Sequence, residues 1–152
     1  MNTVYLTREF DQPPQVVFDA LTNPDYIVRW FGPPNMYTRK AEVDLQVGGK
    51  YTFHLEHDGG GGFNIEGIYQ RIDPPEELVF TLNYVGTKMS RLGESLITMR
   101  LSTLEAGRTR LLFRQEFTLK QENLEGRTKA WEAMFEKMNE LLIFDKANPK
   151  RS

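Results

Sequence analysis

Apolar and polar positions alternate through most of the chain, which is the pattern of half-buried strands. Tyr51, Phe53 and Leu55, for example, alternate with Thr52, His54 and Glu56. The pattern predicts seven strands, one at the start of the chain and six after residue 37. They are expected at residues 3–10, 38–45, 49–72 (two strands joined by the turn 58–62), 78–82, 94–104 and 111–117.

Two short helices are expected between the first and second strands. Pro13 and Pro14 end the first strand, and a proline is tolerated in the first turn of a helix because its missing N–H would be unpaired there. The first helix is expected to end near Asn23, and the second is expected from Asp25 to Trp30. The segment Gly32-Pro33-Pro34 then breaks the helical pattern.

The period changes near the C-terminus from that of a strand to that of an α-helix. One helical stripe is formed by Trp131, Met134, Phe135, Met138, Leu141 and Leu142. Glu132, Lys137 and Glu140 fall on the opposite side. A long amphipathic helix is therefore predicted, with its apolar stripe against the sheet.

These elements predict an α+β fold in which a curved, antiparallel, seven-stranded sheet is covered by the long helix. This helix is the one large apolar surface available to cover the sheet. Because a single helix cannot fill the concave side of a curved sheet at every point, a cavity between them is expected. One domain over residues 1–145 is predicted, with residues 146–152 as a frayed tail.

Composition excludes several classes of protein. The chain has no cysteine and a formal net charge of −2, with acids and bases interspersed, so neither a thiolate site nor a basic surface for nucleic acid is expected. No segment has the roughly 20 apolar residues of a membrane span, and no secretory signal is recognised. A soluble, cytoplasmic protein is expected.

Neither a metal nor a nucleotide cofactor is expected. His54 and His57 are the only histidines, and three positions apart on a strand they would lie on opposite faces. The segment Gly59–Gly62 lacks the Lys-Ser/Thr and the helix start that a phosphate-binding loop needs. It is interpreted as a hairpin tip. No Ser-His-Asp arrangement is visible either, so no catalytic residue is assigned.

Several ordered segments resemble a known family. They are FDALTNP (18–24), RWFGPP (29–34), EVDL (42–45), GGKYTF (48–53), GIYQRIDPPEELVFT (67–81) and the pair Trp131-Glu132. Together they look like the SRPBCC (START-like) superfamily, in the branch named for the activator of the heat-shock-protein-90 ATPase. The resemblance covers essentially the whole chain and implies the helix-grip fold with a deep apolar pocket. The chain departs from the usual family pattern at Phe31, Arg71 and Ala130.

The predicted cavity gives a set of candidate ligand-binding residues. They are Trp30, Phe31, Phe53, Met99, Phe113, Gln115, Trp131, Met134 and Met138. The rings offer apolar area and stacking, and methionines adapt to varied shapes. Each of these side chains has an alternative role in core packing. Gln115, in phase with Phe113 and Phe117, is expected to face inward and to serve either a core network or a ligand.

Three functions follow as hypotheses. The first is a module that binds a small hydrophobic or aromatic molecule, including lipids. The second is a protein-interaction module that binds a chaperone or self-associates. The two-domain activators of this branch carry a further N-terminal domain, which weakens the second hypothesis. The third is a pocket enzyme, a cyclase or hydrolase, for which Glu66, Tyr69 and Tyr84 are the nearest candidates. Fold does not decide among them.

Overall fold

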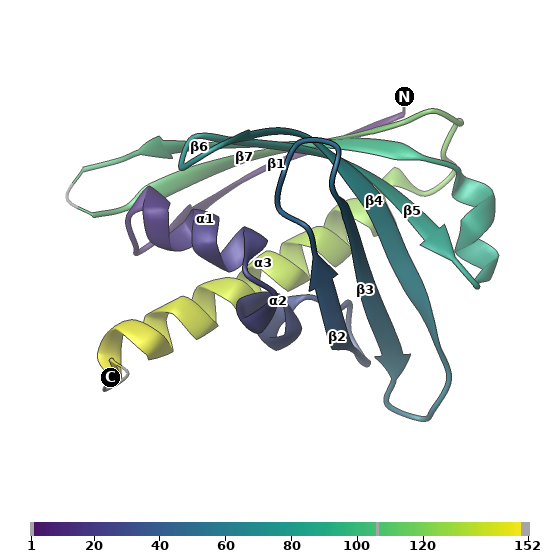
Figure 1. The fold of residues 1–152 in the computed structure, drawn as a ribbon, viewed down its shortest axis with the longest axis horizontal. Helices are drawn as coiled ribbons and strands as arrows, with labels where there is room; N and C mark the ends of the chain where they lie inside the picture. The colour runs from purple at the N-terminus through teal and green to yellow at the C-terminus, as the bar shows by residue number, and fades with distance from the viewer. Residues whose placement is uncertain (1, 106, 150–152) are drawn as a thin grey trace.

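The computed structural model describes residues 2–105 and 107–149 and has one antiparallel sheet curved around a long helix (Figure 1). The strands are β1 (Thr3–Phe10), β2 (Met36–Val43), β3 (Lys50–His57), β4 (Gly62–Asp73), β5 (Glu77–Val85), β6 (Ser95–Thr103) and β7 (Thr109–Phe117). The helices are α1 (Pro14–Thr22), α2 (Pro24–Trp30), the 3-10 helix η1 (Lys88–Leu92) and α3 (Leu124–Ala147). The predicted α+β, helix-grip fold is confirmed.

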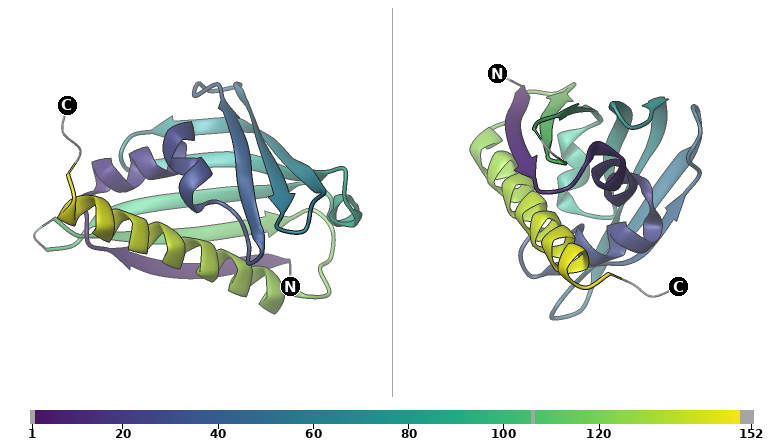
Figure 2. Two further views of the ribbon diagram at one scale, coloured as in Figure 1. Left: turned by 90° about the horizontal axis from the view of Figure 1, so that it is seen from below. Right: turned by 90° about the vertical axis from the view of Figure 1, so that its left-hand side faces the viewer.

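All neighbouring strands in the sheet are antiparallel, in the order β1-β7-β6-β5-β4-β3-β2. The first strand therefore lies beside the last, with Val4 opposite Gln115. The register shifts between Thr38 and Lys40 in β2 and between Tyr69 and Arg71 in β4. Such irregularities bend a strand and increase its twist. Figure 2 shows the sheet curling around α3 and the two short helices.

The concave face of the sheet carries the alternating apolar side chains that the sequence places in phase. Tyr51, Phe53 and Leu55 are all buried. Gly67 lies opposite Tyr51 in the sheet, and a Cβ at position 67 would come within 2.6 Å of the tyrosine ring. The missing side chain therefore leaves room for the ring, whose hydroxyl donates a 2.6 Å hydrogen bond to the Thr81 carbonyl oxygen.

Helix α3 packs with the predicted stripe against the sheet. The side chains of Trp131, Met134, Phe135, Met138 and Leu142 are buried. Glu132, Lys137 and Glu140 are exposed, as expected. The helix continues to Ala147, two residues beyond the expected end of the domain, and residues 150–152 of the expected tail lie outside the described residues.

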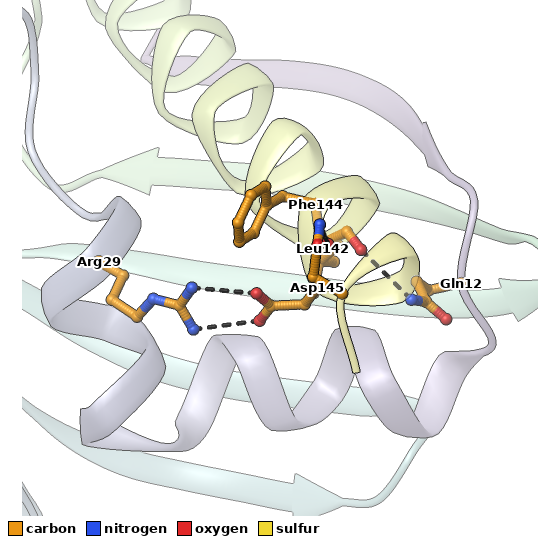
Figure 3. A network of polar contacts seen from close by, with 6 residues as sticks. Gln12, Arg29, Leu142, Phe144 and Asp145 are labelled. Atoms are coloured by element: carbon orange, nitrogen blue, oxygen red, sulfur yellow. Dashed lines mark hydrogen bonds and ion pairs between the residues drawn. The ribbon is translucent and has the colours of Figure 1, made fainter. Parts of the chain in front are cut away.

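The C-terminal end of α3 is tied to α2 and to the segment after β1 (Figure 3). Arg29 of α2 forms a bidentate ion pair with Asp145, with nitrogen–oxygen distances of 3.1 and 3.0 Å. Gln12 donates a 3.4 Å hydrogen bond to the Leu142 carbonyl oxygen. Paired arginine–carboxylate hydrogen bonds fix direction as well as distance. These contacts involve the last turns of α3, at the opposite end of the helix from Arg127 and Trp131.

Candidate functional site

A cavity of about 240 Å³ lies between the first half of α3 and the concave face of the sheet. We call it the apolar cavity. Its walls come from three strands, two helices and the segment after α2, and most of its lining side chains are apolar. The lining residues are Phe31, Pro33, Leu55, Phe63, Ile65, Leu82, Tyr84, Met89, Arg127, Ala130, Trp131 and Met134.

The segment that follows α2 holds the Phe31 ring in the wall. The Phe31 N–H donates to the Ile27 carbonyl oxygen at 2.9 Å, and the Phe31 carbonyl oxygen accepts a 2.7 Å hydrogen bond from Thr38 Oγ1. Gly32 follows with a φ of +153°, and a Cβ there would lie 2.7 Å from the Met36 carbonyl oxygen. Only glycine fits this close approach without a shift of the backbone.

A second, much smaller space of about 20 Å³ lies deeper in the core, and we call it the inner void. Space of this size holds about one water molecule. Phe31 and Trp131 line both spaces. Their rings meet edge to face with centroids 5.7 Å apart, so this pair forms a shared wall between the apolar cavity and the inner void.

A buried hydrogen-bond network fixes the Trp131 ring. The indole Nε1–H donates to Gln115 Oε1 at 2.9 Å, and Gln115 Nε2 donates to Ser95 Oγ at 2.9 Å. Gln115 has no exposed surface. Both ends of its amide are therefore used inside the protein, and the network joins α3 to β7 and β6.

The nine candidate residues are distributed over three places. Phe31, Trp131 and Met134 line the apolar cavity. Trp30, Phe53 and Met99 line the inner void, and Trp30 also donates a 2.8 Å hydrogen bond to the Ala20 carbonyl oxygen, which ties α2 to α1. The structure places the other three among the packed core side chains, where they line neither space; these are Phe113, Gln115 and Met138.

Sequence reasoning missed more than half of the cavity wall. Leu55, Phe63 and Ile65 alternate on the hairpin, and this pattern indicated that they face inward but not which part of the core they reach. Met89 belongs to η1, a 3-10 helix too short to produce a periodic pattern. Arg127, in the first turns of α3, gave no signal at all in the sequence.

Two polar side chains border the apolar cavity, Tyr84 and Arg127. Burial raises the pKa of the Tyr84 hydroxyl, and the nearby Arg127 guanidinium lowers it in part. The hydroxyl is therefore neutral at physiological pH and able to donate a hydrogen bond. Arg127 Nη1 donates to the Met89 sulfur at 3.4 Å, which is a weak acceptor.

The three residues considered for pocket catalysis do not converge. Glu66 lies on the outer face of β4 and forms a 3.0 Å ion pair with Lys50. Tyr69 and Tyr84 face the interior, but Tyr69 lines the inner void and Tyr84 the apolar cavity. Burial raises the pKa of Tyr69 well above its ordinary value. This arrangement gives no acid and base that share one substrate position.

The histidines occupy unrelated surroundings. His54 Nε2 lies 2.9 Å from Glu42 Oε2, and His57 lies at the exposed end of β3. Within residues 2–105 and 107–149, no cluster of three or more His, Cys, Asp or Glu side chains is arranged to hold a metal ion. In the same residues, no helix combines the length and apolarity needed to cross a membrane.

A wider groove of about 1080 Å³ lies near the opposite ends of β4 and β5. It is rimmed by charged side chains that pair with one another: Glu77 forms ion pairs with Arg71 and Arg100. These pairs neutralise one another and leave little net charge to attract a ligand. The apolar cavity is the better candidate, because small-molecule sites are concave and mostly apolar with few polar groups.

Comparison with known proteins places the chain in a family. The model of the family "Activator of Hsp90 ATPase homolog 1-like protein" matches residues 11–143. No curated protein matches the chain in sequence.

Solved structures agree with this assignment at the level of the fold. The crystal structure of protein CV1439 from Chromobacterium violaceum is 24% identical, with a TM-score of 0.82, over 93% of this chain and 97% of that one. Protein NE0264 from Nitrosomonas europaea is 23% identical, with a TM-score of 0.81, over 95% and 96%. An AHSA1 protein from Silicibacter pomeroyi is 18% identical, with a TM-score of 0.81, over 94% and 99%. At these identities the likeness concerns the fold alone, whereas the family model spans most of the sequence, and the chain belongs to the Activator of Hsp90 ATPase homolog 1-like family.

Proposed function

We propose that this protein binds a small apolar molecule in the apolar cavity. The observation that carries the proposal is the cavity itself, about 240 Å³ of space walled mostly by apolar side chains. An engineered apolar cavity of roughly 150 Å³ is enough to bind benzene. The space here therefore suits a molecule of one or two rings, or a chain of similar volume.

The character of the wall supports the same proposal. Met89 and Met134 contribute flexible, polarisable side chains, which adapt to ligands of different shape. Phe31 and Trp131 contribute rigid rings that stack on aromatic ligands. Gln115, by contrast, is taken up by Ser95 and Trp131, so the proposal does not use it as a ligand anchor.

Two alanines of α3 offer a matched test. Ala130 lines the cavity, whereas Ala133, one turn further along the helix, is exposed. Ala130→Leu adds an isobutyl group to the cavity, and Ala133→Leu makes the same change on the solvent side. Binding of the uncharged aromatic probe naphthamide is measured by titration calorimetry for the wild type and both variants.

We expect Ala130→Leu to weaken naphthamide binding at least tenfold and Ala133→Leu to change it less than twofold. Met134→Trp, which fills the cavity from the next turn of α3, is expected to act like Ala130→Leu. Failure of the wild type to bind naphthamide would contradict the proposal, as would equal affinities in the two alanine variants.

An interaction function is the second candidate, favoured by the family description and by exposed apolar side chains near the end of α3. Ile143 and Phe144 are 48% and 60% exposed. In this hypothesis the chain changes the ATPase rate of an Hsp90 protein, and Phe144→Ser reduces the effect. Addition of the purified chain to an Hsp90 ATPase assay separates the two functions, since apolar probes do not enter that measurement.

A further inference from the structure

Arg127 lies at the boundary between two different spaces. It lines the apolar cavity, and it also lines a polar groove of about 460 Å³ at the start of α3. We call this space the cationic groove. It carries three basic side chains, Arg91, Lys120 and Arg127, against one carboxylate, Glu122. The whole chain has a formal net charge of −2, so this excess of positive charge is local.

The two arginines of the cationic groove differ from the other arginines of the described residues. Each of the others forms an ion pair with a carboxylate; these are Arg8, Arg29, Arg39, Arg71, Arg100, Arg108, Arg110 and Arg114. Within residues 2–105 and 107–149, no carboxylate pairs with Arg91 or Arg127. Arg127 is partly buried, and its side-chain partners are uncharged. Its Nη1 donates to the weak acceptor Met89 Sδ at 3.4 Å, and its guanidinium is also a hydrogen-bond partner of the Tyr84 hydroxyl.

A partly buried guanidinium without a carboxylate is suited to an external anion. Its planar N–H donors can form bidentate hydrogen bonds with a carboxylate, and charge-assisted hydrogen bonds are stronger than neutral ones. Tyr84 supplies a neutral hydroxyl near the same position. Beyond these groups the wall is apolar and offers nothing to a second charge.

We infer that the natural ligand is an amphipathic anion, whose apolar body occupies the apolar cavity and whose carboxylate meets Arg127 at the edge of the cationic groove. This inference rests on the proposed function and specifies the class of its ligand. An uncharged molecule of the same shape fits the apolar cavity equally well but leaves Arg127 without an anion. The carboxylate therefore makes the site prefer an anion to an uncharged molecule, and the apolar body of the ligand fills the apolar cavity.

The test compares naphthoate with its uncharged, nearly isosteric partner naphthamide. Affinities for both are measured by titration calorimetry at neutral pH on the wild type, Arg127→Gln and Arg127→Lys. Lys129→Gln is the control, because it removes one positive charge from the same helix at a side chain that is ion-paired with Glu125 and lines neither space.

We expect the wild type to prefer naphthoate by about tenfold or more, as a charge-assisted contact implies. Arg127→Gln should abolish this preference by lowering the affinity for naphthoate to about that for naphthamide. Arg127→Lys should keep part of the preference, and Lys129→Gln should keep nearly all of it. Higher salt should weaken naphthoate binding and leave naphthamide binding unchanged.

The outcomes separate this inference from the proposed function. Equal affinity of the wild type for naphthoate and naphthamide overturns the anion inference and leaves the apolar cavity as a binding site. A preference that survives Arg127→Gln also overturns it, as does an Arg127→Gln variant that loses both probes equally. If neither probe binds to the wild type, both proposals fail.

Discussion

The rings of Phe31 and Trp131 meet edge to face, 5.7 Å apart, and separate the apolar cavity from the inner void. The two rings come from segments 100 positions apart in sequence, one after α2 and one in α3. Trp131 is held by Gln115, and the Phe31 backbone is held by Thr38. This contact therefore keeps the inner void apart from the space that is open to a ligand.

Phe31→Leu should join the two spaces by removing the edge of the shared wall. We expect the free energy of unfolding to fall by about 1–3 kcal/mol, as for many core substitutions. The affinity for a three-ring probe such as anthracene carboxamide should rise relative to naphthamide, as measured by calorimetry. Phe53→Leu, at a ring that lines the inner void but not the apolar cavity, is the control. An unchanged ratio of the two affinities in Phe31→Leu would contradict the shared wall.

Gln115→Leu should destabilise the fold by leaving the Trp131 indole N–H without its acceptor. A buried donor that loses its partner costs about 1–3 kcal/mol. Trp131→Phe removes the donor as well, so the double variant should lose less than the sum of the two single variants in urea denaturation. Strict additivity would show that the 2.9 Å contact between these side chains carries no coupling energy.

Phe135→Ala should cost roughly 3–5 kcal/mol of unfolding free energy, the range for a fully buried large-to-small change. The ring has no exposed surface and lies against Phe10, Trp30, Phe113 and Trp131. Phe144→Ala, on the exposed side of the same helix, should cost less than about 0.5 kcal/mol. Denaturant melts compare the two variants, and a loss below about 1 kcal/mol for Phe135→Ala would be inconsistent with this packing.

Stability should fall at alkaline pH because buried tyrosines resist ionisation. Burial raises the pKa of Tyr69, as it does for Tyr51 and Tyr84, above the ordinary value of 10.0. The stability that these buried tyrosines contribute is fully present below pH 10, because their hydroxyls are then protonated in both the folded and the unfolded chain. As the pH rises further, the unfolded chain loses the proton first, and each such group removes at most about 1.4 kcal/mol per pH unit.

Tyr69→Phe should therefore change stability little at neutral pH and reduce the alkaline loss. Urea denaturation at neutral pH and at several pH values above 10 measures how steeply the free energy of unfolding falls with pH in the wild type and in the variant. Tyr5→Phe, at an exposed position, is the control and should leave the slope unchanged. A Tyr69→Phe slope equal to that of the wild type would contradict the assigned burial effect.

The fold could be predicted from the sequence because its elements are long and strongly periodic. The stripe from Trp131 to Leu142 has the helical period, and Tyr51 to Leu55 has the period of a strand. Helix η1 was not predicted, because five residues from Lys88 to Leu92 give no measurable period. The expected end of the domain at residue 145 falls short of Ala147, where α3 ends, and helix ends are weakly determined by periodicity.

The cavity was predicted only in general terms, since periodicity gives the face on which a side chain lies and not its depth. Phe113 and Met138 are inward, as expected, but the structure places them in tightly packed parts of the core. Gln115 was in phase with Phe113 and Phe117, and its two partners could not be known before the sheet and α3 brought Ser95 and Trp131 together. Arg127 lies outside every apolar pattern, so only the three-dimensional structure relates it to the cavity.

Isotope-edited NMR of the naphthoate complex, with methyl-labelled methionine, shows whether the ligand occupies the apolar cavity. Of the methionines described, Met89 and Met134 line the apolar cavity, Met99 lines the inner void, and Met36 and Met138 line neither space. We expect nuclear Overhauser contacts from the naphthoate ring protons to the methyl groups of Met89 and Met134. Contacts confined to other methionines, or a bound probe with no methionine contacts, would contradict it.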